Sequence, residues 1–187
     1  MGVIGWIVIG VVVLIVLFVI TLYNRLVSLR NQAGNAWAQI DVQLKRRHDL
    51  IPNLIETVKG AMSYEQETLR QVIEARNAAT TASGPAQQGA AEGVLTGALN
   101  KLFALVENYP QLKANDNVKQ LQEELTATEN KISFARQYYN DSVMSLNNAV
   151  QTFPSNLIAG QFGFAQKQFF EVPQSETAVP QVNLKLH

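Results

Sequence analysis

The sequence predicts an all-α fold in which an N-terminal transmembrane helix continues into a long-helix antiparallel four-helix bundle, followed by an aromatic-rich irregular C-terminal tail. Three observations predict it: residues 1–24 carry no charge, apolar residues then recur at spacings of three and four to about residue 151, and turns containing Gly or Pro separate the helical stretches. Zero net charge argues against a nucleic-acid binder, and the absence of cysteine rules out disulfides and thiolate metal sites.

The N-terminal segment has the length and composition of a membrane span. Residues 3–20 are eighteen apolar or glycine residues in a row, residues 21–23 extend the run, and the first charge is Arg25. As a helix, this run crosses a hydrocarbon core of about 30 Å. No charged segment precedes the run and no Ala-x-Ala site follows it, so a retained anchor over residues 1–23 is favoured over a cleaved signal peptide. The residues expected at the two ends of the anchor are Val3, Trp6, Ile20 and Tyr23.

Basic residues predict the orientation of this anchor. The flank before the span has no Lys or Arg, whereas Arg25 and Arg30 follow it closely and Lys45, Arg46 and Arg47 come later. The positive-inside tendency therefore places the bundle in the cytoplasm. A periplasmic bundle is the alternative, because only two of these basic residues lie close to the span.

The bundle is expected over residues 24–151, and two of its helices are long. The first, at about 24–60, continues directly from the anchor and contains Pro52, which either kinks it or starts a new helix; the unbroken apolar period favours a kink. The fourth, at about 115–151, has mostly apolar a and d positions over more than four heptads, weakened at Thr128 and Ser142, which suits a bundle or a coiled coil.

Two shorter helices, at about 64–81 and 86–108, are expected between the long ones. The second of these begins with Gly89, Gly93 and Gly97, each of which costs about 1 kcal/mol relative to Ala in a helix. Such a start is either frayed or forms a smooth stripe for the close approach of another helix. Short turns favour antiparallel neighbours, so the fourth helix is expected to return towards the membrane.

The C-terminal segment, residues 152–187, contains five of the eight Phe residues. These aromatic side chains either fold onto the end of the bundle, dip into the lipid interface or dock on a neighbouring subunit. Residues 182–186 alternate as in a short strand, which is either disordered or pairs with another copy or protein. The residues predicted to form an interface or to contact lipid are Phe153, Phe162, Phe164, Phe169, Phe170, Val182, Leu184 and Leu186.

Few residues of this chain are suited to catalysis. The two histidines are His48 and the terminal His187, and no Glu stands three residues before His48, as a di-iron bundle requires. No glycine-rich phosphate loop is present either. We therefore predict no catalytic residue, no metal and no cofactor. A polar cluster lies beside Pro52 and consists of Arg46, Arg47, His48 and Asp49. One alternative is structural, in which the cluster is solvated or caps the bundle. The other is functional, in which it is a docking site for a partner or an anionic ligand.

Several stretches carry a family resemblance. Residues 23–31 read YNRLVSLRN and residues 36–54 read AWAQIDVQLKRRHDLIPNL; later, residues 135–140 read ARQYYN, residues 153–160 read FPSNLIAG and residues 162–164 read FGF. In this order they resemble the LemA family of bacterial membrane proteins over nearly the whole chain. The resemblance implies a single-span protein of the bacterial inner membrane with an antiparallel four-helix bundle and no established catalytic activity. A relative in magnetosome-forming bacteria is associated with building those membranes.

Two functions follow from these expectations. The first is a non-enzymatic membrane-anchored scaffold that self-assembles and organises or remodels a bacterial membrane, with membrane lipid and copies of itself as partners and no nucleic acid. Deleting residues 173–187 is then expected to reduce assembly. The second is a monomeric membrane-tethered adaptor that presents a face of the bundle to an envelope or signalling partner.

Overall fold

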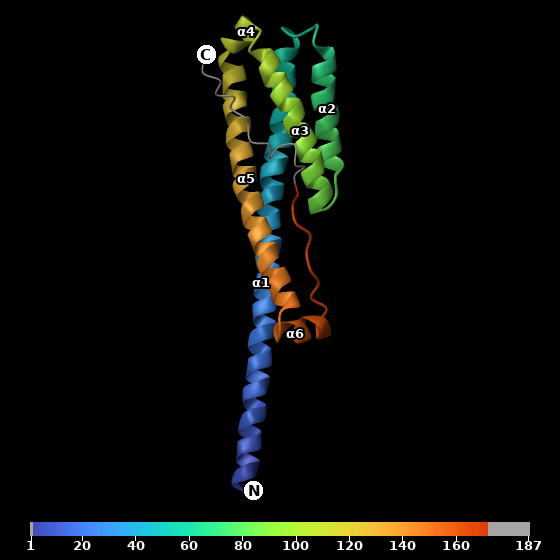
Figure 1. Cartoon of the computed structure of the whole chain (residues 1–187). Helices are drawn as coiled ribbons and strands as arrows, with labels where there is room; N and C mark the ends of the chain where they lie inside the picture. Colours follow the sequence, from blue (N-terminus) through green and yellow to red (C-terminus); the bar gives the residue numbers. More distant parts are fainter. Residues whose placement is uncertain (1, 172–187) are drawn as a thin grey trace, which may run out of the picture. The chain divides into compact units, whose positions relative to one another are not determined.

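The computed structural model describes residues 2–171 of the 187-residue chain (Figure 1). Every regular element within these residues is a helix, so the predicted all-α class is confirmed. The short helices α4 and α6 were not predicted, because one or two turns carry too few residues for a periodic pattern. The elements are α1 (Val3–Lys59), α2 (Gln66–Thr81), α3 (Pro85–Val106), α4 (Pro110–Lys113), α5 (Asp116–Gln151) and α6 (Ser155–Gln161).

The longest helix, α1, contains both the apolar run and the first bundle helix without interruption. Its apolar first part is exposed, starting with Val3 at 77%, whereas Leu26 is fully buried and begins a stripe of buried residues. The helix continues through Pro52, so the alternative in which a new helix starts there is wrong. It ends at Lys59, just before Gly60, a residue type that favours helix ends.

The described chain divides into two compact units. The first consists of residues 2–42 and 131–169, and the second consists of residues 43–130 with residues 170 and 171. Both α1 and α5 contribute to each unit, whereas α2, α3 and α4 belong to the second and α6 to the first.

The second unit has a continuous apolar core, and α2 packs beside α3 in it (Figure 1). Its part of α5 begins with a side-chain cap, because Oδ1 of Asn115 accepts hydrogen bonds from the backbone N–H groups of Asn117 (2.9 Å) and Val118 (3.4 Å). The largest fully buried side chains of this core are Ile51, Leu54, Val58, Met62, Val72, Leu95, Leu102, Val106 and Val118.

The first unit has buried residues along α1 and α5 and a cluster where these helices meet α6. The cluster comprises Leu26, Ala149, Ala159 and Phe164. Further buried residues of α1 and α5 in this unit are Ala33, Ala36, Ile40, Ile132, Tyr139, Val143 and Leu146. In this unit α6 runs across α1 rather than along it (Figure 1).

The chain after α6 is irregular, as predicted for the aromatic tail, but it is held to α5. Nδ2 of Asn147 donates to the carbonyl oxygen of Lys167 and Oδ1 of Asn147 accepts from the Lys167 N–H, both at 2.9 Å. The hydroxyl of Tyr139 donates to the carbonyl oxygen of Gln168 at 2.8 Å. These bonds satisfy backbone groups that have no helix or sheet partner.

Candidate functional site

Three titratable side chains meet inside the second unit. Arg47 and His48 lie on α1 and Glu92 lies on α3, and their residues are only 3%, 7% and 4% exposed. Nη1 of Arg47 donates to Oε2 of Glu92 at 2.9 Å, and Nε2 of His48 lies 2.7 Å from Oε1 of Glu92. Successive residues of a helix point about 100° apart, so one carboxylate reaches both side chains by lying between them.

Further polar groups complete this buried cluster. Nη2 of Arg47 donates to Oγ1 of Thr96 at 2.7 Å and forms an ion pair with Oε2 of Glu129 on α5 at 2.9 Å. Nε2 of Gln88 donates to Oε1 of Glu92 at 3.2 Å. Glu92 is therefore surrounded by three partners, and a buried charge needs such pairing because its desolvation costs several kcal/mol.

Pro52 connects the cluster to α2. In an α-helix the carbonyl oxygen of His48 would accept a hydrogen bond from the N–H of residue 52, but proline has no N–H. Nε of Arg76 on α2 donates to this oxygen instead, at 2.7 Å. The cluster thereby joins four helices, α1, α2, α3 and α5.

Most polar groups of this arrangement are paired within it; Oε2 of Glu129 has the ion pair with Arg47 but no hydrogen bond. A cavity of about 190 Å³ adjoins Arg47 and Glu129 and is also lined by Thr96, Asn100 and Phe103. Both terminal nitrogens of Arg47 are already engaged by carboxylates and a hydroxyl. A guanidinium bound in this way has little capacity left for an anionic ligand.

The four residues predicted as a docking site separate into two groups. The side chain of Arg46 is 52% exposed and lies 3.6 Å from Oε2 of Glu124, and Asp49 is exposed as well. Arg47 and His48 are buried in the cluster and are not available to a partner at the surface. Docking therefore stays a prediction for Arg46 and Asp49.

The anchor residues lie on an uncovered part of α1. Val3 (77%), Trp6 (67%) and Ile20 (48%) are exposed. Among the described residues, α1 is the one helix long and apolar enough to cross a membrane, and none of its most apolar stretch is buried within the protein. Tyr23 differs from the other anchor residues, because its ring contacts Phe162 edge-on with 5.0 Å between centroids.

The five C-terminal Phe residues do not form one patch. Phe164 (8% exposed) and Phe170 (3%) are buried, as expected if these side chains pack within their own chain. Phe153 (80%), Phe162 (55%) and Phe169 (39%) are exposed. The predicted strand residues Val182, Leu184 and Leu186 lie outside the described residues.

Sequence reasoning missed several residues that organise these sites. Glu92 is the one charge between residues 77 and 100, and a lone carboxylate in an apolar stretch signals a buried partner. Pro52 lies in a stretch with helical spacing and has no N–H, so the carbonyl oxygen of His48, four residues earlier, lacks its helical partner. This predicts a donor from elsewhere in the chain, which the structure identifies as Arg76. No local signal marks Asn147, because its partner lies 20 residues away.

Comparison with known proteins agrees with the family resemblance of the sequence. The LemA family matches residues 36–184. Magnetosome protein MamQ of Magnetospirillum gryphiswaldense is 26% identical over 90% of this chain and 74% of its own length. Protein LemA of Metamycoplasma hominis is 27% identical over 82% of this chain and 70% of its own length. Magnetosome protein MamQ 2 of Paramagnetospirillum magneticum is 25% identical over 88% of this chain and 72% of its own length. With a match over most of its length, the chain belongs to the LemA family.

Proposed function

We propose that this LemA-family chain is a non-enzymatic membrane-anchored scaffold that self-assembles and organises or remodels a bacterial inner membrane, with its bundle in the cytoplasm. Its partners are membrane lipid and other copies of itself. The relatives named magnetosome proteins support a role in membrane organisation. The uncovered apolar part of α1 supports the anchoring.

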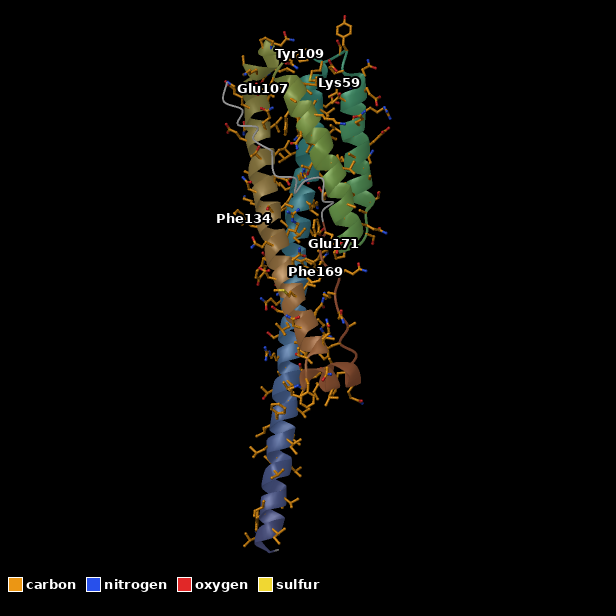
Figure 2. All side chains as sticks on the ribbon, in the orientation of Figure 1. Lys59, Glu107, Tyr109, Phe134, Phe169 and Glu171 are labelled. Atoms are coloured by element: carbon orange, nitrogen blue, oxygen red, sulfur yellow. The ribbon has the colours of Figure 1, made fainter. Side chains whose placement is uncertain are left out.

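One observation carries the self-assembly. Phe134 and Tyr138 lie one turn apart on α5 in the first unit and are 73% and 44% exposed. Figure 2 shows Phe134 on the outer side of α5. Exposed aromatic side chains are enriched where proteins contact one another. Anchoring in one bilayer raises the effective concentration of such surfaces, so a weak contact suffices for assembly.

A non-enzymatic role is supported by the buried polar side chains, which pair with one another. His48 is the one histidine in the described part of the chain, and its ring faces Glu92, which also pairs with Arg47. These groups bind each other within the bundle, so their interactions are used to hold helices together.

The test is the mass and shape of the full-length chain in mild detergent, measured by light scattering and electron microscopy. We expect a uniform particle of many copies, and the double substitution Phe134→Ser with Tyr138→Ser is expected to reduce its mass. Val94→Ser removes an equally exposed apolar side chain (64%) from α3 and serves as the matched control. A single chain of 20.7 kDa for the unmodified protein would overturn self-assembly.

The second candidate is the monomeric adaptor, which is favoured by the exposure of Arg46 and Asp49 on α1. It predicts a single chain in detergent that co-purifies with one specific protein. Arg46→Ala and Asp49→Ala should then abolish co-purification without changing the particle mass. If both variants retain the partner, this surface is not the docking site.

A further inference from the structure

We propose that α6 lies at the boundary between the headgroups and the acyl chains of the bilayer, with Phe153, Leu157 and Phe162 inserted among the lipid chains beside the anchor. The inference rests on the proposed membrane anchoring and commits this surface to lipid. The residues concerned all belong to the first unit, as does the apolar part of α1.

The depth of α6 follows from one ring contact. Tyr23 is 20 residues after Val3, which at 1.5 Å per residue places it about 30 Å along α1, the thickness of a hydrocarbon core. The ring of Tyr23 lies 5.0 Å from that of Phe162, centroid to centroid. When α1 spans the bilayer, Phe162 is therefore at the level where the acyl chains meet the headgroups.

The exposed surface of α6 and its two flanks is uncharged and carries three large apolar side chains beside the polar Asn156 and Gln161. Phe153 is 80% exposed, Leu157 is 63% exposed and Phe162 is 55% exposed. Leu157 points away from the protein, because it is two positions before the buried Ala159 and thus about 200° from it around the helix. The whole stretch 142–166, which includes α6, contains no Asp, Glu, Lys or Arg.

The direction of α6 suits this location. The helix runs across α1 (Figure 1), so it lies along the membrane surface when α1 crosses the bilayer. Interfacial helices lie in this plane with their apolar side chains in the acyl boundary. Two exposed basic residues, Arg25 and Arg30, follow Tyr23 on α1 and lie where lipid phosphates are expected.

Continuity with the anchor favours lipid over a second copy of the chain as the occupant. Phe162, the residue directly after α6, contacts Tyr23 at the end of an apolar span that is itself uncovered. Lipid that surrounds the span therefore reaches α6 without any further partner. A second copy would have to displace that lipid from both surfaces at once.

The absence of cysteine allows a direct test in the full-length chain. Leu157→Cys, and separately Phe153→Cys, are labelled with the environment-sensitive fluorophore NBD. Each protein is reconstituted at fewer than one chain per vesicle in phosphatidylcholine with a minor fraction of phosphatidylglycerol. Quenching is compared for nitroxide lipids labelled near the headgroup and near the end of the acyl chain. Both sites are exposed, so either label is tolerated by the fold.

Two controls calibrate the depth. Val13→Cys lies in the middle of the apolar run and should be quenched more strongly by the deep nitroxide. Ser133 is an exposed residue of α5, 18 residues and thus about 27 Å before the end of that helix at Gln151. The label on Ser133→Cys should therefore be quenched by neither the shallow nor the deep nitroxide. For Leu157→Cys and Phe153→Cys we expect several-fold stronger quenching by the shallow nitroxide than by the deep one.

Three outcomes would overturn the inference. Emission and quenching at both α6 sites that match Ser133→Cys would mean that α6 lies in water. Blue-shifted emission that neither nitroxide quenches would mean that protein covers α6. A lack of quenching at Val13→Cys would remove the proposed anchoring, and the inference with it. Because the contact between Tyr23 and Phe162 lies within one chain, a failure of self-assembly would leave the expected result unchanged.

Discussion

A Cβ atom added to Gly89 would lie 1.9 Å from the carbonyl oxygen of Glu171. Gly89 is buried near the start of α3, and the backbone after Phe170 passes directly over it. Gly97, two turns later on α3, has no neighbouring atom within 4 Å of such a Cβ. The close approach, one of the two alternatives for the glycine stripe, therefore occurs at Gly89 and not at Gly97, and the irregular chain after α6 rather than a helix makes it.

The two glycines should respond in opposite ways to alanine. Gly97→Ala should stabilise the protein by about 0.5–1 kcal/mol, because alanine favours the helix and the space is open. Gly89→Ala should displace the backbone at Glu171, because a contact of 1.9 Å cannot persist. Thermal unfolding measures the first effect, and hydrogen exchange of the Phe170 and Glu171 amides measures the second. Unchanged exchange in Gly89→Ala would show that this segment does not rest on α3.

Glu92 should be far more important for stability than an exposed carboxylate. Glu92→Gln leaves Arg47 without one of its two carboxylate partners in a buried site and should cost about 3 kcal/mol in the free energy of unfolding. Glu124→Gln, which removes the exposed partner of Arg46, should change it by less than about 1 kcal/mol. Urea unfolding followed by circular dichroism compares the two. Equal costs would show that the buried cluster contributes no more than a surface ion pair.

The sequence predicts the helices better than it predicts their polar contacts. The periodic pattern of residues 24–151 indicates the long helices, because burial of one face requires spacings of three and four. The partners of His48 and Arg47 depend on which helices become neighbours, and no local pattern encodes this. The same limit applies to Tyr23, for which the sequence predicts an interfacial ring but not the contact with Phe162, more than 130 residues away.

Asn147 should hold the extended segment after α6 in place. Asn147→Ala removes both hydrogen bonds to the backbone of Lys167, so the exchange rate of the Lys167 amide should rise tenfold or more, which corresponds to about 1.4 kcal/mol. Asn148→Ala changes an exposed neighbour and is the control. Exchange measured by mass spectrometry on the full chain distinguishes the two. If both variants exchange alike, the segment is held by its aromatic side chains instead.

Tyr139 should make stability depend on alkaline pH. Burial raises the pKa of the Tyr139 hydroxyl above its ordinary value of 10.0, so the folded chain keeps this proton at a pH where the unfolded chain loses it. The free energy of unfolding should therefore fall as the pH rises above 10. Tyr139→Phe should lower stability near neutral pH, because the bond to Gln168 is lost, but it should flatten the alkaline decline. An identical pH dependence in both proteins would assign the decline to other groups.

Pro52 and Arg76 should be energetically coupled through the carbonyl oxygen of His48. Arg76→Met removes the donor at 2.7 Å and leaves that oxygen without its partner, which should cost about 1–3 kcal/mol. Pro52→Ala restores an N–H one helical turn after His48, so the same Arg76→Met substitution should then cost at least about 1 kcal/mol less.

A double-mutant cycle with urea unfolding measures this coupling between Pro52 and Arg76. Arg70→Met provides the matched control, because Arg70 is an exposed arginine of α2 that pairs with Glu67 and Glu74 and should be additive with Pro52→Ala. If the costs of Arg76→Met and Pro52→Ala are also additive, the hydrogen bond from Arg76 does not compensate for the N–H that Pro52 lacks. A coupling confined to Arg76 would show that an imino acid in α1 is tolerated because α2 supplies the hydrogen bond that α1 lacks.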